Sequence, residues 1–416
     1  MQYIKIFTIN ISEGNGEMKR VKVMFIAGES SGDLLAAELA QELKLTILDK
    51  IKSDKTFSQP LTTTLEPYFF GAGGSKMKSA GIDVVFDLTK HSSIGPVDAL
   101  KNYKYYKDAF DQLIELAFLK MPDLIVCVDF SGFNLRFASA LRKNIHKHQG
   151  AFFRWSPKII QYVSPQVWAS RPWRARKLGE NFDLLLSIFP FEKEWYKNRV
   201  PQLKVEFVGH PIIDRYPDSG GAKREKNSLP KILLLPGSRY GELKRHLPPM
   251  VEAVKYIRQQ IADARLLMVL PDEDLKNYAM PFVSSLDGLL ITTGDLKTAL
   301  INSDVAIAST GTVTLECAYF KLPTVAIYKT SVLTYTIGKR IVNVKYLAMP
   351  NIIANEDVFP ELIQHNATGE NIAKKTLELL DESKRQIIQK KLDSVIQSLG
   401  NPGAAKRAAE IVANLL

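Results

Sequence analysis

The chain has 416 residues, of which 46% are hydrophobic and 24% charged, and its formal net charge is +11. This length predicts two domains, and the composition excludes an intrinsically disordered protein. Cys127 and Cys317 lie in apolar runs and offer neither a disulfide framework nor a zinc site, as expected in the reducing cytoplasm. No apolar run reaches about 18 residues, so the sequence predicts no membrane-spanning helix.

Short apolar runs alternate with amphipathic helical stretches, a pattern that predicts an α/β fold built on parallel sheets. Residues 1–17 precede the first clear strand and are interpreted as an N-terminal extension, with Met18 as an alternative start. Residues 18–215 are expected to form a first Rossmann-like, doubly wound domain. Its strands are expected at 21–27, 124–128, 159–163, 184–188 and 205–208.

Residues 216–231 contain proline, a Gly-Gly pair and mixed charges, and are interpreted as a linker. Residues 232–416 repeat the pattern and are expected to form a second Rossmann-like domain, whose last helix is a candidate to pack back on the first. Its strands are expected at 232–235, 265–270, 289–292, 305–308 and 324–328. Two such domains would face a central cleft between the carboxyl ends of their strands, where these folds bind ligands.

The turn at 28–33, Gly-Glu-Ser-Ser-Gly-Asp, follows the first strand and begins a helix. Gly28, Ser31 and Gly32 would let a ligand approach the backbone, where the free N–H groups of a helix start attract anions or sugar oxygens. The turn lacks the GxGxxG pattern, so no dinucleotide cofactor is expected. An ordinary turn with an N-cap residue is the alternative.

The turn at 236–239, Pro-Gly-Ser-Arg, repeats this design at the start of the second domain. Gly237 and Ser238 form the turn, and the paired donors of the Arg239 guanidinium suit a diphosphate. A structural turn with a surface arginine is the alternative.

The segment 309–316, Ser-Thr-Gly-Thr-Val-Thr-Leu-Glu, also follows a strand and begins a helix. Thr310, Gly311 and Thr312 offer hydroxyls and N–H groups to phosphate, and Glu316 can accept hydrogen bonds from ribose hydroxyls. A capping box with Thr312 as the N-cap is the alternative. Two such turns at equivalent places favour phosphate binding.

Asp129 ends the strand at 124–128. A carboxylate there would point into the cleft and could act as a general base, and a structural cap of the next turn is the alternative. Asp33 is expected to serve the start of its own helix. Asp272 and Asp274 form an Asp-x-Asp pattern that is interpreted as a solvated acidic loop. The six histidines form no HxxxH or HExxH motif, so no metal site is expected.

The positive charge is concentrated in two stretches. No Asp or Glu occurs between Asp129 and Glu180, or between Glu316 and Glu356. Such stretches attract polyanions, among them phosphorylated ligands, anionic lipid and nucleic acid. A solvated basic face without a ligand is the alternative.

The most specific motifs are Tyr-Val-Ser-Pro-Gln-Val-Trp-Ala at 162–169 and Leu-Pro-Gly-Ser-Arg at 235–239. Other motifs lie at 27–33, 70–74, 128–129, 133–135, 189–193, 207–211, 311–316 and 349–354. In these segments the chain resembles the lipid-A-disaccharide synthase family of the GT-B superfamily, from about residue 21 to the C-terminus.

The resemblance implies a metal-independent, inverting glycosyltransferase that needs no cofactor. It implies transfer of 2,3-diacylglucosamine from UDP to the 6-hydroxyl of 2,3-diacylglucosamine 1-phosphate. The products are the β-1,6-linked tetraacyl disaccharide 1-phosphate of lipid A synthesis and UDP. Family members act at the inner face of the cytoplasmic membrane without spanning it, so peripheral binding to an anionic surface is also implied, and dimers occur in the family.

The resemblance also assigns site residues. Asp129 is the candidate catalytic base, with Glu29 as the second catalytic candidate. The residues implied to bind the UDP-sugar are Gly237, Ser238, Arg239, Thr310, Gly311, Thr312, Glu316 and Asn351. The residues implied on the acceptor side are Gly28, Ser31, Gly32 and Ser164.

The chain departs from the family pattern at 131–132, at Ser170 and at 94–98, where a more apolar segment is associated with the acyl chains. These departures leave the acyl-chain preference and the details of the acceptor site open, but not the reaction class. A GT-B transferase or epimerase that acts on unacylated UDP-N-acetylglucosamine is the nearest alternative function. A nucleic-acid-binding protein is the alternative of another class, but no recognition motif occurs, so no nucleic-acid partner is expected.

Overall fold

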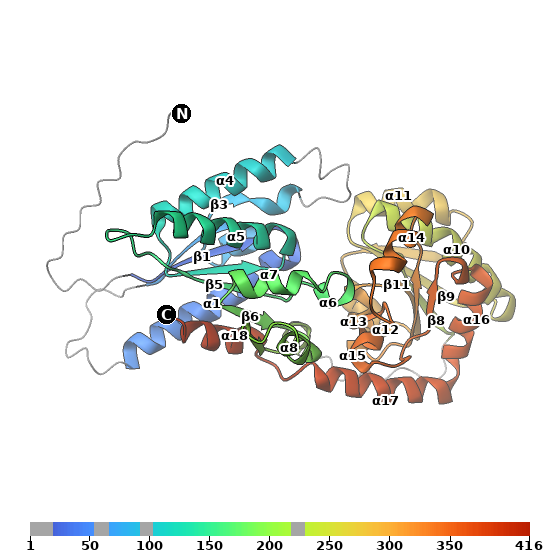
Figure 1. The fold of residues 1–416 in the computed structure, drawn as a ribbon. Helices are drawn as coiled ribbons and strands as arrows, with labels where there is room; N and C mark the ends of the chain where they lie inside the picture. Colours follow the sequence, from blue (N-terminus) through green and yellow to red (C-terminus); the bar gives the residue numbers. More distant parts are fainter. Residues whose placement is uncertain (1–19, 54–65, 92–102, 218–228) are drawn as a thin grey trace.

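The computed structural model describes residues 20–53, 66–91, 103–217 and 229–416. The expected N-terminal extension, the segment 94–98 and most of the expected linker lie outside the described residues. The described chain forms two parallel sheets, each with hydrophobic clusters on both faces and helices packed over them (Figure 1). The predicted α/β class with two doubly wound units is therefore confirmed.

The first sheet has seven parallel strands in the order β3-β2-β1-β4-β5-β6-β7. The strands are β1 (Lys22–Ala27), β2 (Tyr68–Gly73), β3 (Asp83–Asp87), β4 (Leu124–Val128), β5 (Lys158–Tyr162), β6 (Leu184–Ser187) and β7 (Lys204–Phe207). The helices are α1 (Ser30–Ser53), α2 (Ser75–Ser79), η1 (Leu88–His91), α4 (Tyr103–Lys120), α5 (Ser131–His148), α6 (Val167–Ser170), α7 (Arg174–Asn181), α8 (Pro190–Lys197) and α9 (Ile212–Arg215). Because β1 pairs directly with β4, with Ala27 opposite Val128, the turns after these two strands lie side by side at the switch point of the sheet.

The second sheet has six parallel strands in the order β10-β9-β8-β11-β12-β13. The strands are β8 (Lys231–Leu235), β9 (Arg265–Leu270), β10 (Leu289–Thr293), β11 (Val305–Ser309), β12 (Thr324–Tyr328) and β13 (Glu361–Ile363). The helices are α10 (Tyr240–Gln260), α11 (Glu273–Val283), α12 (Leu296–Asn302), α13 (Thr312–Tyr319), α14 (Val332–Ile341), α15 (Met349–Ala354), η2 (Gln364–Asn366), α16 (Gly369–Leu380), α17 (Glu382–Ser398) and α18 (Ala404–Ala413). Here β8 pairs with β11, with Leu235 opposite Ala308, so the turns after β8 and β11 are also neighbours.

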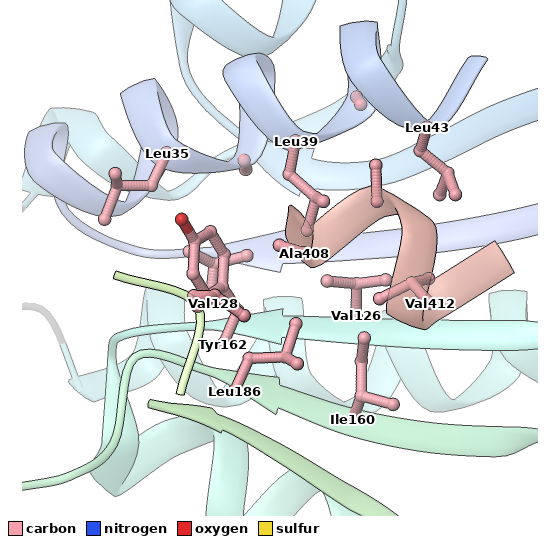
Figure 2. Packing of buried hydrophobic residues seen from close by; sticks show 14 of the residues in the cluster. Leu35, Leu39, Leu43, Val126, Val128, Ile160, Tyr162, Leu186, Ala408 and Val412 are labelled. Carbon is pink, nitrogen blue, oxygen red and sulfur yellow. The ribbon is translucent and has the colours of Figure 1, made fainter. Parts of the chain in front are cut away.

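Hydrophobic packing holds the turn between β1 and α1 in place. All five residues of β4 are buried, as expected for a central strand covered on both faces. On α1, Leu35, Leu39 and Leu43 recur at helical spacing and face β4 and β5 (Figure 2). Burial of each leucine contributes about 1.5–3 kcal/mol. The turn between β1 and α1 is therefore anchored at both ends.

The last helix returns to the first unit. After α17 has run along the second unit, α18 lies beside α1 (Figure 1), and Val412 joins the hydrophobic cluster between them (Figure 2). The Asp214 carboxylate accepts a 2.8 Å hydrogen bond from the Ala404 N–H at the start of α18. The Lys50 ammonium donates at 2.8 Å to the Ala413 carbonyl at its end. Within the described ranges, no helix has the length and apolar content that crossing a bilayer requires.

Candidate active site

A cavity of about 460 Å³ opens at the carboxyl end of the second sheet. Because β8 and β11 are neighbours, the turns that follow them meet there. Seven of the residues predicted to bind a UDP-sugar line the cavity: Gly237, Ser238, Arg239, Thr310, Gly311, Thr312 and Glu316. The structure therefore gathers two distant segments of the sequence around one space.

Two glycines give these turns their shape. Gly237 and Gly311 have φ angles of 124° and 133°, which residues with a Cβ rarely adopt. A Cβ on Gly237 would lie 2.3 Å from an oxygen of Glu242 and would displace that carboxylate. The second turn leads into α13, which begins at Thr312, and the N-terminus of a helix stabilises an anion.

Sequence reasoning missed Glu242, which lines the cavity from the first turn of α10. Its carboxylate accepts a 3.0 Å hydrogen bond from the Ser238 N–H and lies 3.5 Å from the Arg239 guanidinium. The carboxylate thus engages two groups that were predicted to hold a diphosphate. An acidic residue in the first turn of the helix was the available signal.

His246 is a second missed residue, and it fixes the turn at 236–239 from the interior. Its Nε2 accepts a 3.1 Å hydrogen bond from the Lys329 N–H, so the Nδ1, 2.7 Å from the Pro236 carbonyl oxygen, must carry the proton. Burial lowers the pKa of His246, in keeping with a neutral ring. No sequence motif marked this residue, because its role depends on two segments that only the fold brings together.

Glu316 connects the cavity to the end of the first unit. Its side chain is 13% exposed, accepts a 3.1 Å hydrogen bond from the Tyr216 hydroxyl and lies 3.9 Å from the Arg215 guanidinium. Burial raises the pKa of the Glu316 carboxyl, and these two partners act in the opposite direction.

The structure does not bring Asn351 to the cavity. Its side chain is fully buried, with the amide nitrogen 2.8 Å from the Phe359 carbonyl oxygen and 2.9 Å from the Glu361 carboxylate. The amide oxygen accepts hydrogen bonds of 3.1 Å and 2.8 Å from the N–H groups of Val358 and Phe359. Asn351 therefore braces the chain behind α15, and its polar atoms are already engaged.

Ser164, predicted on the acceptor side, lies beneath the surface. It is 4% exposed, its hydroxyl oxygen is 3.0 Å from the Tyr196 hydroxyl, and it also hydrogen-bonds the Glu192 carboxylate. Glu192 is fully buried and accepts a 2.9 Å hydrogen bond from the Trp168 indole. This polar network fixes the loop between β5 and α6.

The two catalytic candidates come together because β1 and β4 are neighbours. Burial raises the pKa of the Asp129 carboxyl, while hydrogen bonds from the Phe130 N–H and the Ser31 hydroxyl act against the rise. Partial desolvation raises the pKa of Glu29, the negative charge of Asp129 adds to the rise, and the Arg239 guanidinium opposes it. Glu29 of the first unit is therefore within electrostatic range of Arg239 of the second unit.

The backbone at Asp129 is strained. Asp129 and Phe130 have φ angles of 47° and 39°, in a left-handed region that costs on the order of 1–3 kcal/mol. The Asp129 carbonyl oxygen accepts hydrogen bonds of 2.9 Å from the Asn134 amide and 3.0 Å from the Gln161 amide. Both amides belong to buried side chains, so the core holds this turn in its strained form.

The two glycines predicted on the acceptor side differ in how tightly they are packed. A Cβ on Gly28 would lie 2.3 Å from the Phe130 ring, so the absence of a side chain makes room for this aromatic residue. A Cβ on Gly32 would lie 3.5 Å from the Asp129 Cβ, which is an ordinary contact. Gly28 is therefore required for packing of the turn, a role that the sequence did not predict.

The Asp-x-Asp pattern lies at the start of α11. Asp272 is the N-cap, and its carboxylate accepts a 2.8 Å hydrogen bond from the Leu275 N–H. Pro271, which precedes this pattern, lines the 460 Å³ cavity, so the loop interpreted as a solvated acidic loop borders the cavity. Among the residues that the structure describes, no three His, Cys, Asp or Glu side chains are gathered as metal ligands would be.

Known proteins share both the sequence and the fold. The family model described as LpxB, lipid-A-disaccharide synthetase, matches residues 23–415. The lipid-A-disaccharide synthase of Sulfurihydrogenibium sp. (strain YO3AOP1) is 34% identical over 416 residues, which cover 95% of this chain and 98% of that protein.

Solved structures with low sequence identity share the fold. S. aureus MnaA, solved with UDP, is 14% identical with a TM-score of 0.56, and the match covers 96% of this chain and 98% of that one. CalG4, the calicheamicin glycosyltransferase, is 14% identical with a TM-score of 0.55, and the match covers 96% and 99%. The two units therefore form the GT-B fold.

Proposed function

This chain belongs to the lipid-A-disaccharide synthase family, and we propose that it transfers 2,3-diacylglucosamine from UDP to 2,3-diacylglucosamine 1-phosphate. Its membership makes it a glycosyltransferase of lipid A disaccharide synthesis. The acylated substrates, the inversion at the anomeric carbon and the residue roles below are the proposal. In it, residues 18–215 hold the acceptor and residues 232–416 hold the UDP-sugar.

UDP is proposed to occupy the 460 Å³ cavity. The N-terminus of α13 and the Arg239 guanidinium would hold the diphosphate, because both favour anions and the guanidinium offers paired donors. In this structure the Glu242 carboxylate contacts the Ser238 N–H and the Arg239 guanidinium. These contacts would have to break so that both groups can bind the phosphate oxygens. Glu316 would accept hydrogen bonds from the ribose hydroxyls.

Asp129 is proposed as the general base, with Glu29 as the alternative. Its raised pKa makes the ionised carboxylate a better proton acceptor. It takes the proton of the acceptor 6-hydroxyl while that oxygen attacks the anomeric carbon of the donor. The bond to UDP breaks, and its electron pair leaves on the diphosphate. Attack from the face opposite UDP inverts the anomeric carbon and gives the β-1,6 linkage.

Peripheral binding to the inner face of the cytoplasmic membrane completes the proposal. Each substrate carries two acyl chains, and burial of each CH₂ in a bilayer contributes about 0.8 kcal/mol, so the enzyme must meet its substrates at the surface. The Asn343 N–H donates a 2.8 Å hydrogen bond to the Ala169 carbonyl oxygen and thereby joins the two stretches that lack acidic residues. Trp173, 64% exposed, adds an interfacial aromatic residue.

One observation carries the reaction class for this chain. Arg239 of the second unit acts electrostatically on Glu29, which in turn lies beside Asp129 of the first unit. The group proposed for the leaving diphosphate and the carboxylate proposed for the attacking hydroxyl therefore both lie within electrostatic range of Glu29, which supports a transfer between two sugars.

The test is a direct assay in detergent micelles that contain EDTA. The purified chain is incubated with 2,3-diacylglucosamine 1-phosphate and either UDP-2,3-diacylglucosamine or UDP-N-acetylglucosamine, and products are identified by mass spectrometry. We expect tetraacyl disaccharide 1-phosphate from the acylated donor only, with a β linkage by NMR. Transfer or epimerisation of the unacylated sugar alone would assign the chain to another GT-B activity.

A further inference from the structure

A second, smaller cavity of about 200 Å³ lies in the first unit beside the proposed base. The start of α5, the loop after β5 and the start of α7 enclose it. Its polar lining comes from Ser131, Gln166, Ser170, Arg171 and Arg174. The reaction described above assigns no role to these side chains.

The cavity is strongly basic. Burial, and then the like charges of Arg171 and Arg136, lower the pKa of the Arg174 guanidinium. No carboxylate in the described part of the chain forms an ion pair with any of these three arginines. The surrounding stretch, 130–179, contains no Asp or Glu at all. These like charges therefore lie within electrostatic range of one another without an ion-paired carboxylate, an arrangement that a bound anion would relieve.

Two further features of the backbone favour an anion here. The helix α5 begins at Ser131 with no side-chain cap and no acidic residue in its first turn, so the N–H groups of that turn can attract an anion, while the Asp129 carboxylate bonds the Phe130 N–H that precedes them. The loop across from it is rigidly held, since the Trp168 indole and the Ser164 hydroxyl both bond the buried Glu192 carboxylate. The loop that precedes Arg171 and Arg174 is therefore held in a fixed position.

The cavity is also close to the proposed reaction centre. Ser131 follows Asp129 by two residues, so their Cα atoms are at most about 7 Å apart. A single sugar ring can therefore place a phosphate in the cavity while one of its hydroxyls reaches Asp129.

We propose that this cavity binds the phosphomonoester of the acceptor sugar through Arg171 and Arg174, with Arg136 and the start of α5 adding positive charge. The assignment rests on the proposed function, because it supplies a site for the 1-phosphate of that acceptor. It makes the cavity a determinant of acceptor specificity, which orients the 6-hydroxyl toward Asp129 by holding the opposite end of the sugar.

The experiment compares two acceptors, 2,3-diacylglucosamine 1-phosphate and the same lipid without its phosphate, in wild type and in Arg171→Ala and Arg174→Ala. Arg176→Ala is the matched control, because Arg176 lies on the same helix, is 84% exposed and pairs with Glu180. Removal of a charge-assisted contact should raise KM for the phosphorylated acceptor about tenfold to hundredfold. The KM for the UDP-sugar should not change.

With the dephosphorylated acceptor, both variants should match wild type, since the contact is already missing. Equal losses on both acceptors would overturn the proposal and assign the arginines to folding or to general membrane contact. Binding of the same variants to phosphatidylglycerol vesicles tests whether the arginines contact a lipid headgroup phosphate and not the acceptor phosphate. Weaker vesicle binding with an unchanged acceptor KM would also overturn the assignment. If Arg174→Ala does not fold, the exposed Arg171 carries the test alone. A wild type without transferase activity would instead refute the proposed function.

Discussion

The Tyr216 hydroxyl donates a 3.1 Å hydrogen bond to the Glu316 carboxylate, and so ties the segment that leaves the first unit to the wall of the 460 Å³ cavity. The Tyr319 hydroxyl donates at 2.8 Å to the Tyr216 carbonyl oxygen and strengthens the same junction. Glu316 is consequently oriented by the junction between the units as well as by its own helix.

Tyr216→Phe should destabilise the protein by about 1–3 kcal/mol, because it leaves a buried acceptor without its donor. It should also raise the pKa of Glu316, since the Tyr216 hydrogen bond acts to lower it. Urea unfolding measures the first effect, and the pH dependence of UDP binding by calorimetry measures the second. Tyr256→Phe, an exposed tyrosine on α10, is the control. If both variants unfold at the same urea concentration, the junction contributes nothing to stability.

Asp129→Asn should lower kcat about 10²–10⁴-fold, the usual contribution of general-base catalysis. The substitution is nearly isosteric, and the backbone contacts of Asp129 remain, so UDP affinity should be unchanged. Steady-state kinetics with the acylated substrates measure the effect, with Asp274→Asn on the exposed start of α11 as the control. If the variant keeps more than about a tenth of wild-type kcat, another group accepts the proton, and Glu29→Gln would then be tested.

Arg239→Ala should weaken UDP binding about tenfold to hundredfold, because a charged contact to phosphate contributes about 1.5–3 kcal/mol. Arg239→Lys should restore only part of the affinity, since an ammonium cannot donate two parallel hydrogen bonds. Isothermal titration with UDP measures both. Lys244→Ala removes a positive charge one turn along α10 from an exposed position and serves as the control. Equal UDP affinity in wild type and Arg239→Ala would leave the diphosphate without this contact.

The buried Glu192 should make stability depend on pH. Burial raises the pKa of Glu192 from 4.5 to about 7. Between pH 4.5 and pH 7 the Glu192 carboxyl is therefore protonated in the folded protein and ionised in the unfolded chain. The free energy of unfolding should therefore fall as pH rises from about 4.5 to 7, by up to roughly 3 kcal/mol from this group.

Glu192→Gln keeps the shape of the side chain and removes its titration. Urea unfolding of both proteins across this pH range isolates the contribution, because other buried carboxyls are common to both. The stability of wild type relative to Glu192→Gln should decline as pH rises. A difference that is constant with pH would mean that Glu192 titrates as an ordinary carboxyl.

Binding to anionic vesicles should weaken with salt, because screening shortens the range of charge attraction. Lys339→Ala with Arg340→Ala, two exposed residues in the last turn of α14, should reduce affinity for phosphatidylglycerol vesicles about tenfold or more, at about 1 kcal/mol per charge. Lys255→Ala with Lys374→Ala is the control, because it removes the same charge from exposed positions on α10 and α16. Co-sedimentation at several salt concentrations measures the effect. Identical binding to neutral and anionic vesicles would remove the electrostatic part of the proposal.

The sequence by itself determined the fold class and the positions of the glycine turns that line the 460 Å³ cavity. Alternating apolar strands and amphipathic helices are local patterns, and parallel sheets follow from them because each strand must cross over a helix to its neighbour. Glycines placed directly after strands, such as Gly237 and Gly311, likewise mark tight turns from sequence alone, since only glycine readily adopts their φ angles. Seven of the residues predicted to bind the UDP-sugar line this one cavity.

Only the tertiary structure decided which turns meet and which side chains stay free. The pairing of β1 with β4 brings Glu29 to Asp129, and no local pattern encodes strand order. Asp33 accepts hydrogen bonds of 2.7 Å and 2.9 Å from the N–H groups of Gly74 and Lys76, and so caps α2 in place of its own helix. The side-chain amide of Asn351 likewise hydrogen-bonds within the protein, to the backbone of Phe359. A polar residue in a motif looks the same in sequence whether it faces a ligand or the core, because its burial depends on segments far away along the chain.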